Sequence, residues 1–211
     1  LDVNVNPDNP VIGKKERSFS GDAATVSHYA SIYSRHFLNQ KIQCVYKHFP
    51  GHGSSTKDSH LGFVDVTDTW QAYELDPYQQ LLKSNESCGV VMTAHIVNRQ
   101  LDASGLPATL SHTILTNLLR NQLNFKGVII TDDMQMKAIS DNYGLEQALV
   151  LTINAGADML IFGNNLSVNP QDPKQLIDII EDKVLSGDIN PERINDAYQH
   201  IRALKQTIKR S

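Results

Sequence analysis

Residues 47–60, KHFPGHGSSTKDSH, gather titratable side chains in a segment that can form neither a helix nor a strand. Three histidines, two lysines and an aspartate are interspersed with Pro50 and two glycines, which interrupt regular structure. Irregular segments of this length inside a compact fold are typically either functional or disordered. Because Phe49 and Phe63 can anchor the segment in a core, we expect an ordered, functional loop.

Asp58 and His60 form the smallest unit of this loop that can move a proton. A histidine titrates near neutral pH and can therefore both give and take a proton. An aspartate two residues away can hydrogen-bond the other ring nitrogen, which fixes the tautomer and stabilises the imidazolium. In isolation the tripeptide DSH would more often be an accident of the surface, so the pair needs support from its surroundings.

Asp132 and Asp133 form a second candidate group, at the end of the apolar run GVIIT. A carboxylate at the end of a core strand can act as the nucleophile toward the anomeric carbon of a sugar. The alternative is a solvated strand end or a cap for the following segment MQMKAIS. Two adjacent aspartates can divide these tasks between them.

Four short runs are continuously apolar rather than alternating, at residues 44–48, 89–95, 127–133 and 157–163. Such runs are typical of parallel strands that are covered on both faces. Helical patterns lie between and after them, at residues 23–38, 75–82, 145–156 and 173–187, and following Ser111 and Asn190. Repeated αβ units leave two architectures, an open doubly wound sheet or a (β/α)₈ barrel.

Each apolar run ends in polar residues: Lys47 and His48, then His95, then Asp132 and Asp133, then Gly163, Asn164 and Asn165. Since a barrel carries its active site at the carboxyl ends of its strands, these endings favour the barrel. No glycine-rich phosphate loop directly follows a strand, which disfavours nucleotide binding. A whole barrel has eight strands and typically about 250 residues, so we expect only part of one here, with a strand stub at residues 1–5.

The composition of the chain limits the kinds of partner that it is expected to bind. Its 211 residues carry a formal net charge of −4, which gives no basic footprint for nucleic acid. No apolar run approaches the length of a membrane span. Cys44 and Cys88 are too few for a disulfide framework, and we expect them to be buried free thiols in core strands.

The loop at residues 47–60 resembles the motif K-H-F-P-G-H-G-x-x-x-x-D-S-H of glycoside hydrolase family 3, in its β-N-acetylhexosaminidase branch. Further similar segments follow the family order, at residues 9–22, 74–82, 90–96, 106–111, 118–139 and 155–162. The resemblance covers nearly all 211 residues. It implies a (β/α)₈ TIM barrel, of which residues 1–211 would form the C-terminal portion, from the end of strand 4 through strand 8 and the closing helices.

The resemblance also implies a reaction. It is the retaining hydrolysis of terminal β-linked N-acetylglucosamine from a small carbohydrate substrate, such as a muropeptide from peptidoglycan, with no cofactor and no metal. Asp132 would be the nucleophile that forms a covalent glycosyl intermediate, and His60 would be the acid/base with Asp58 as its partner. The residues that match sugar-binding positions of the family are Arg17, Lys47 and His48. His95 is a weaker candidate for the same site.

Three alternatives stay open. A phosphorylase of the same fold would use phosphate in place of water. A metal-dependent hydrolase would need ligands at fixed strand ends, drawn from His48, His52, His60, His95 and Asp132. An inactive fragment would carry the motifs without turnover. We expect an upstream segment or a second chain to complete the barrel, and we leave open a cytoplasmic or a cell-envelope location.

Overall fold

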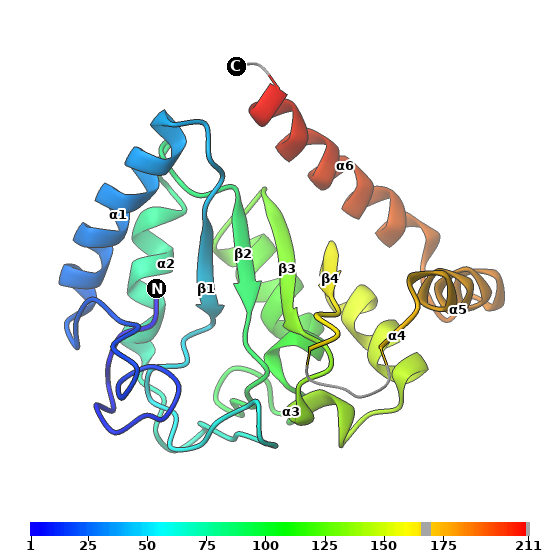
Figure 1. Ribbon diagram of the computed structural model, residues 1–211, viewed down its shortest axis with the longest axis horizontal. Coiled ribbons are helices and arrows are strands. Elements are labelled where there is room, and N and C mark those ends of the chain that lie inside the picture. The colour runs from blue at the N-terminus through cyan, green and yellow to red at the C-terminus, as the bar shows by residue number, and fades with distance from the viewer. Residues whose placement is uncertain (166–169, 210–211) are drawn as a thin grey trace.

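The computed structural model describes residues 1–165 and 170–209, and a sheet of four parallel strands lies at its centre (Figure 1). The strands are hydrogen-bonded in chain order: β1 (Val45–Phe49), β2 (Val90–Thr93), β3 (Val128–Asp133) and β4 (Met159–Ile161). Each begins one or two residues after the start of the predicted run. The parallel α/β class is therefore confirmed, whereas the stub expected at residues 1–5 is not a strand.

Helices separate and flank the strands. The α-helices are α1 (Ala23–Asn39), α2 (Asp76–Leu81), α3 (Lys137–Ser140), α4 (Leu145–Ala155), α5 (Pro173–Ser186) and α6 (Pro191–Lys209), and there is a π-helix at Thr113–Gln122. Short 3₁₀ turns lie at Ala72–Leu75 and Ala108–Leu110. The caps expected from sequence are present: Ser111 Oγ accepts from the Ile114 amide at 3.0 Å, and Gly156 ends α4 at φ 118°.

The two edges of the sheet differ in what they carry. The carboxyl ends of the strands and the irregular segments lie together at the lower edge in Figure 1. At the opposite edge α6 runs past the amino ends of the strands, where Thr207 bonds Gln43 at 3.0 Å. None of the helices in residues 1–165 and 170–209 is long and apolar enough to cross a membrane.

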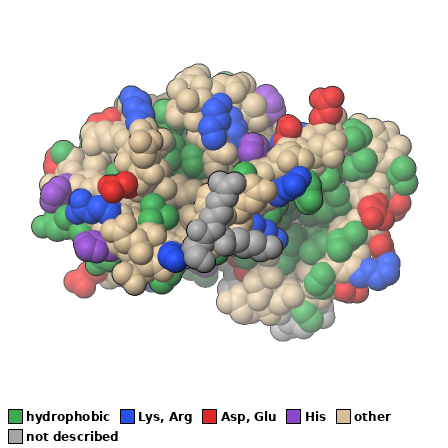
Figure 2. Space-filling view, turned by 90° about the horizontal axis from the view of Figure 1, so that it is seen from above, with side chains coloured by type: hydrophobic (Ala, Val, Ile, Leu, Met, Phe, Trp, Pro, Cys, Tyr) green, Lys and Arg blue, Asp and Glu red, His purple; other side chains and the backbone are tan. Residues whose placement is uncertain are grey.

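Helix α1 differs from its predicted amphipathic pattern. Val26 and Ala30 pack into the core, but Tyr29, Tyr33 and Phe37 are 48%, 55% and 42% exposed. With Phe19 they form an aromatic row, with ring centroids 5.2 Å apart for Phe19 and Tyr33 and 6.4 Å for Tyr33 and Phe37. The reason is that β1 is an edge strand, so no further αβ unit among the described residues covers this side. Figure 2 shows hydrophobic side chains at the surface on this side.

The expectation of free thiols was wrong, because Cys44 and Cys88 form a disulfide. Cys44 directly precedes β1, and Cys88 lies two residues before β2. These strands pair in register, with Val45 opposite Val90, which brings the two cysteine Cα atoms to 5.0 Å, within the range that a disulfide requires. Spacing along the sequence carried no sign of this pairing, since it follows from the register of neighbouring strands.

Candidate active site

A cavity of about 530 Å³ opens at the carboxyl edge of the sheet. Five of the six residues predicted for the site line it: Arg17, Lys47, His48, His60 and Asp132. The sixth, Asp58, lies behind His60 and hydrogen-bonds it. The structure thus brings together side chains from three separate segments: the irregular chain before α1, the end of β1 with the loop that follows it, and the end of β3.

Asp58 and His60 form the hydrogen-bonded pair that their spacing predicts. Asp58 Oδ1 lies 2.7 Å from His60 Nδ1 and also accepts from the His60 amide at 2.9 Å. Burial alone would raise the pKa of Asp58, but the two hydrogen bonds from His60 outweigh it and hold that pKa below its ordinary value. An ionised carboxylate accepts only, so Nδ1 carries a hydrogen. The His60 side chain is 39% exposed, and its Nε2 remains available to a ligand.

The two aspartates at the end of β3 have different surroundings. Asp133 Oδ1 accepts from the amides of Gln135 at 3.0 Å and Gly163 at 3.2 Å, so this carboxylate ties the turn after β3 to the end of β4. Asp132 lines the cavity and accepts from the Asp133 amide at 2.9 Å. The two aspartates therefore differ in place: Asp133 caps the turn after β3, and Asp132 faces the cavity.

Lys47 and His48 reach the cavity from the end of β1. The Lys47 side chain is exposed, whereas His48 is buried and only 6% exposed. His48 Nδ1 lies 2.7 Å from the Asp2 carboxylate. The peptide bonds between Lys47 and His48 and between Phe49 and Pro50 are both cis.

Arg17 is placed by side-chain hydrogen bonds within an irregular segment. Asn9 Oδ1 accepts from the amides of Val11 and Ile12 at 2.8 and 3.0 Å, and the Arg17 amide then bonds the Ile12 carbonyl at 3.0 Å. Asn9 also donates to the His52 carbonyl at 2.7 Å. The same asparagine therefore shapes the turn that carries Arg17 and joins that turn to the loop after β1.

Sequence reasoning missed Asp2 and considered His52 only as a possible metal ligand. Asp2 is buried, only 5% exposed, and accepts from the His52 amide at 2.8 Å. Both ring nitrogens of His52 are occupied, by Ser55 at 2.7 Å and Ser59 at 3.1 Å, and burial lowers its pKa. Asp2 follows Leu1 as a polar residue, which is the only sign of it in the sequence. Because residues 1–5 contain no continuous apolar run, nothing there indicated that the aspartate is buried.

His95 lies behind the site and does not line the cavity. It is 1% exposed, with Nδ1 at 2.8 Å from Thr109 Oγ1 and Nε2 at 3.0 Å from the Asp133 carbonyl. A carbonyl only accepts, so Nε2 carries the hydrogen, and burial lowers the pKa of the ring. With both nitrogens occupied in His52 and in His95, the metal-ligand set considered above loses two of its five members.

Two glycines of the loop are required by close packing. A Cβ at Gly53 would lie 1.6 Å from the Val3 carbonyl oxygen, and Gly51 has φ 119° next to Glu74. Glu74 in turn accepts from the Gly53 amide at 3.1 Å and from the Gln71 amide at 3.1 Å. Burial raises the pKa of Glu74 to about 7. The loop is thus held from below by a buried carboxyl group.

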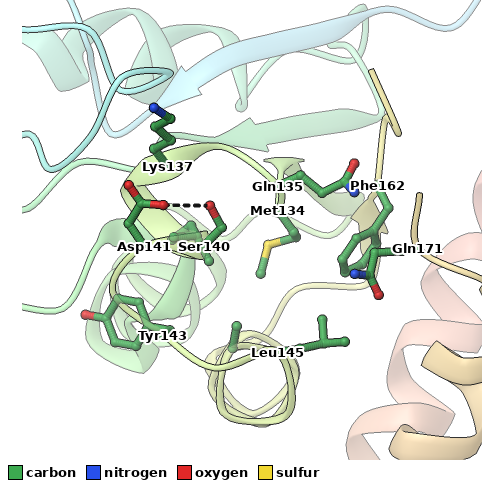
Figure 3. Close-up of a pocket in the computed structure, with 11 residues that line it drawn as sticks. Met134, Gln135, Lys137, Ser140, Asp141, Tyr143, Leu145, Phe162 and Gln171 are labelled. Carbon is green, nitrogen blue, oxygen red and sulfur yellow. Dashed lines mark hydrogen bonds between the residues drawn. The ribbon is translucent and has the colours of Figure 1, made fainter. Parts of the chain in front are cut away.

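A second cavity of about 380 Å³ lies on the far side of the β3 end (Figure 3). In this view Met134, Leu145 and Phe162 surround an apolar space, and Ser140 and Asp141 are hydrogen-bonded at its rim. None of the residues predicted for the site lines it. The residues predicted for the site therefore lie at the first cavity and not at this one.

A carboxylate and an aspartate-supported histidine that share one cavity can supply a nucleophile and a proton donor, the two groups that retaining cleavage of a glycosidic bond requires. The chain belongs to glycoside hydrolase family 3, since the family model described as "Glycosyl hydrolase family 3 N terminal domain" matches residues 1–204.

Known relatives agree. "Beta-hexosaminidase A" of Pseudoalteromonas piscicida is 33% identical over 227 residues, an alignment that covers 100% of this chain and 37% of that protein. The structure of a glycoside hydrolase family 3 beta-N-acetylglucosaminidase from Paenibacillus sp. str. FPU-7 superposes with a TM-score of 0.89 at 34% identity, covering 99% of this chain and 39% of that one. The resemblance to the β-hexosaminidase branch is confirmed.

A third relative has a different activity in its name. The structure described as "Beta-glucoside phosphorylase BglX bound to 2FGlc" superposes with a TM-score of 0.86 at 26% identity, covering 99% of this chain and 37% of that one. The chain spans 37% of the length of the Pseudoalteromonas relative and 52% of the "Beta-hexosaminidase LpqI" of Mycobacterium tuberculosis.

Proposed function

We propose that this chain carries the catalytic centre of a retaining β-N-acetylhexosaminidase that releases terminal N-acetylglucosamine from small carbohydrates such as muropeptides. The observation that carries the proposal is the cavity itself, where Asp132 and His60 are joined by Arg17, Lys47 and His48. The parallel sheet with its site at the carboxyl edge supports a place in the C-terminal part of a (β/α)₈ barrel.

In the first step Asp132 attacks the anomeric carbon while His60 donates its Nε2 proton to the departing oxygen. The glycosidic bond breaks, the aglycone leaves as an alcohol, and the sugar is held as an ester of Asp132. The His60 ring is then neutral, with no hydrogen on Nε2, and Asp58 still accepts from Nδ1. In the second step His60 takes a proton from water, the oxygen of that water attacks the same carbon, and the Asp132 carboxylate is released.

The cationic groups bind the sugar rather than react with it. Lys47 and Arg17 are donors only and can bond hydroxyl oxygens of the bound ring. An imidazole acid/base departs from the usual pair of carboxyl groups. A histidine in this role places no second anion beside Asp132. A second anion there would disfavour ionisation of the nucleophile.

Covalent labelling tests the assignment. A 2-fluoro glycoside with a good leaving group should accumulate as an ester on Asp132, which mass spectrometry of the peptic peptides would locate. Asp132→Ala should abolish turnover, while the matched variant Asp133→Ala should retain a labelled Asp132 if it folds. Labelling of Asp133 in the wild-type protein would refute the assignment.

Phosphorolysis is a second candidate, favoured by the similarity to the structure described as a β-glucoside phosphorylase. A neutral histidine beside the leaving group would repel a phosphate less than a carboxylate would. The two reactions differ in one measurement. Added phosphate should leave the rate unchanged and give free sugar in a hydrolase, whereas it should accelerate turnover and give sugar 1-phosphate in a phosphorylase.

A further inference from the structure

Asp2 lines the cavity and collects three donors from the end of β1 and the loop that follows it. Its carboxylate accepts from the His48 amide at 3.2 Å, from the His52 amide at 2.8 Å, and it lies 2.7 Å from His48 Nδ1. The Asp2 side chain is only 4% exposed. Burial alone would raise its pKa, but the close contact with His48 outweighs burial, and the pKa of Asp2 is lowered. Asp2 is therefore ionised at neutral pH.

An ionised Asp2 decides which nitrogen of His48 carries the hydrogen. A carboxylate only accepts, so His48 Nδ1 must donate to it. In the neutral ring Nε2 then holds a lone pair and can only accept. His48 Nε2 has no partner among residues 1–165 and 170–209, and the ring lines the cavity. In that neutral form, the group that His48 offers to a ligand is an acceptor.

We propose that Asp2 is a positioning residue that fixes His48 as the hydrogen-bond acceptor for one sugar hydroxyl. Lys47 and Arg17 line the same cavity and only donate. A hydroxyl group can meet both demands at once, because its oxygen accepts from a cation while its hydrogen goes to His48 Nε2. An ether oxygen or a fluorine at the same ring position accepts but does not donate, and would leave His48 Nε2 without a partner.

This inference rests on the proposed function, since it assumes that a sugar occupies this cavity. It deepens that function by assigning a specificity, for glycosides with a free hydroxyl at the position that faces His48. A site built to bond a hydroxyl group rejects analogues that lack it far more strongly than an apolar pocket rejects a change of size.

The tautomer of His48 can be read without turnover. In protein labelled with ¹⁵N-histidine, long-range ¹H–¹⁵N correlations distinguish a ring protonated at Nδ1 from one protonated at Nε2, and His48→Gln assigns the signal. We expect Nδ1–H in the wild-type protein and a shift toward Nε2–H in Asp2→Asn. A wild-type ring that carries a hydrogen on Nε2, alone or together with Nδ1, would overturn the proposal.

Binding and kinetics test the consequence. Aryl glycosides with fluorine in place of one ring hydroxyl at a time should reveal one position where kcat/KM falls by about 5- to 150-fold, the range for an unpaired buried group. That loss should largely disappear in His48→Ala, because the partner is already gone. Asp2→Asn should lower kcat/KM on the parent glycoside within the same range. The control Asp22→Asn removes a charge from the cap of α1, away from the cavity, and should leave kcat/KM unchanged.

The outcomes separate the two claims. If every fluorinated glycoside reacts and binds like its parent, the inference is wrong even if hydrolysis is confirmed. If the wild-type protein binds the parent sugar, loses affinity for one fluorinated analogue and shows the expected tautomer, yet cleaves none of them, the inference stands and the proposed function fails. Should Asp2→Asn not fold, the tautomer of the wild-type ring and the fluorinated series still decide.

Discussion

The disulfide between Cys44 and Cys88 allows a stability effect to be worked out from the structure. It joins residues 44 positions apart, and closing a loop of that size removes about 13 cal/mol/K of entropy from the unfolded chain, or about 4 kcal/mol at 25 °C. Domains are typically stable by only about 5–15 kcal/mol, so reduction should remove a large share of the margin. In a domain of this size we expect the thermal midpoint to fall by roughly 8–16 °C.

The assay is urea unfolding of the oxidised and the reduced protein. The matched control is Cys44→Ala/Cys88→Ala, which should unfold like the reduced wild-type protein and show no response to the reductant. The bridge lies at the amino ends of β1 and β2, away from the cavity, so kcat at low temperature should not change. Equal unfolding midpoints with and without reductant, or two reactive thiols in the denatured, non-reduced protein, would refute the reasoning.

Three further expectations concern the site and its support. His60→Ala should slow glycosides with poor leaving groups by about 10²–10⁴-fold and aryl glycosides with good ones far less; an equal loss on both would limit His60 to binding. Burial raises the pKa of Glu74 from 4.5 to about 7, so the folded state holds this proton more tightly than the unfolded state, and stability should fall as pH rises from 4.5 to 7. Urea unfolding of Glu74→Gln should lack that decline, and a decline of equal slope would exclude Glu74 as its source. Because β1 is an edge strand of the sheet and α1 exposes its aromatic row, a longer polypeptide that pairs with β1 should be more stable and more active than residues 1–211 alone; a fully active, cooperatively folded monomer of the 211 residues would contradict this.

The strands and most helices were predictable because their signals are local. A continuous apolar run such as GVIIT buries itself whatever lies elsewhere in the chain, and Ser111 caps the residues next to it. The disulfide and the exposed face of α1 were not predictable, because both depend on which strands are neighbours. Register places Cys44 beside Cys88, and the edge position of β1 leaves Tyr33 uncovered.

In the candidate site, too, the features with local signals were predicted and those that depend on distant contacts were not. Residues in the loop after β1 and at the end of β3 were found from their types and spacing, and the structure places them around one cavity. The side chains that hold them were missed, because their partners lie some 40 to 50 residues away: Asp2 bonds His48 and His52, Asn6 bonds the Ser55 carbonyl, and Asn9 bonds the His52 carbonyl.

These bonds also explain how two irregular segments can carry a fixed site. Neither residues 1–22 nor the loop after β1 has a helix or strand ladder to satisfy its backbone groups, and buried groups without partners are costly. Asp2, Asn6 and Asn9 supply the missing partners, and each connects one segment to the other. Contacts between the two segments therefore hold the turn that carries Arg17, and Asp2 also holds the ring of His48 at the end of β1. Removal of any one of these three side chains should loosen both segments together, and with them the proposed sugar-binding groups, before it unfolds the sheet that lies beneath them.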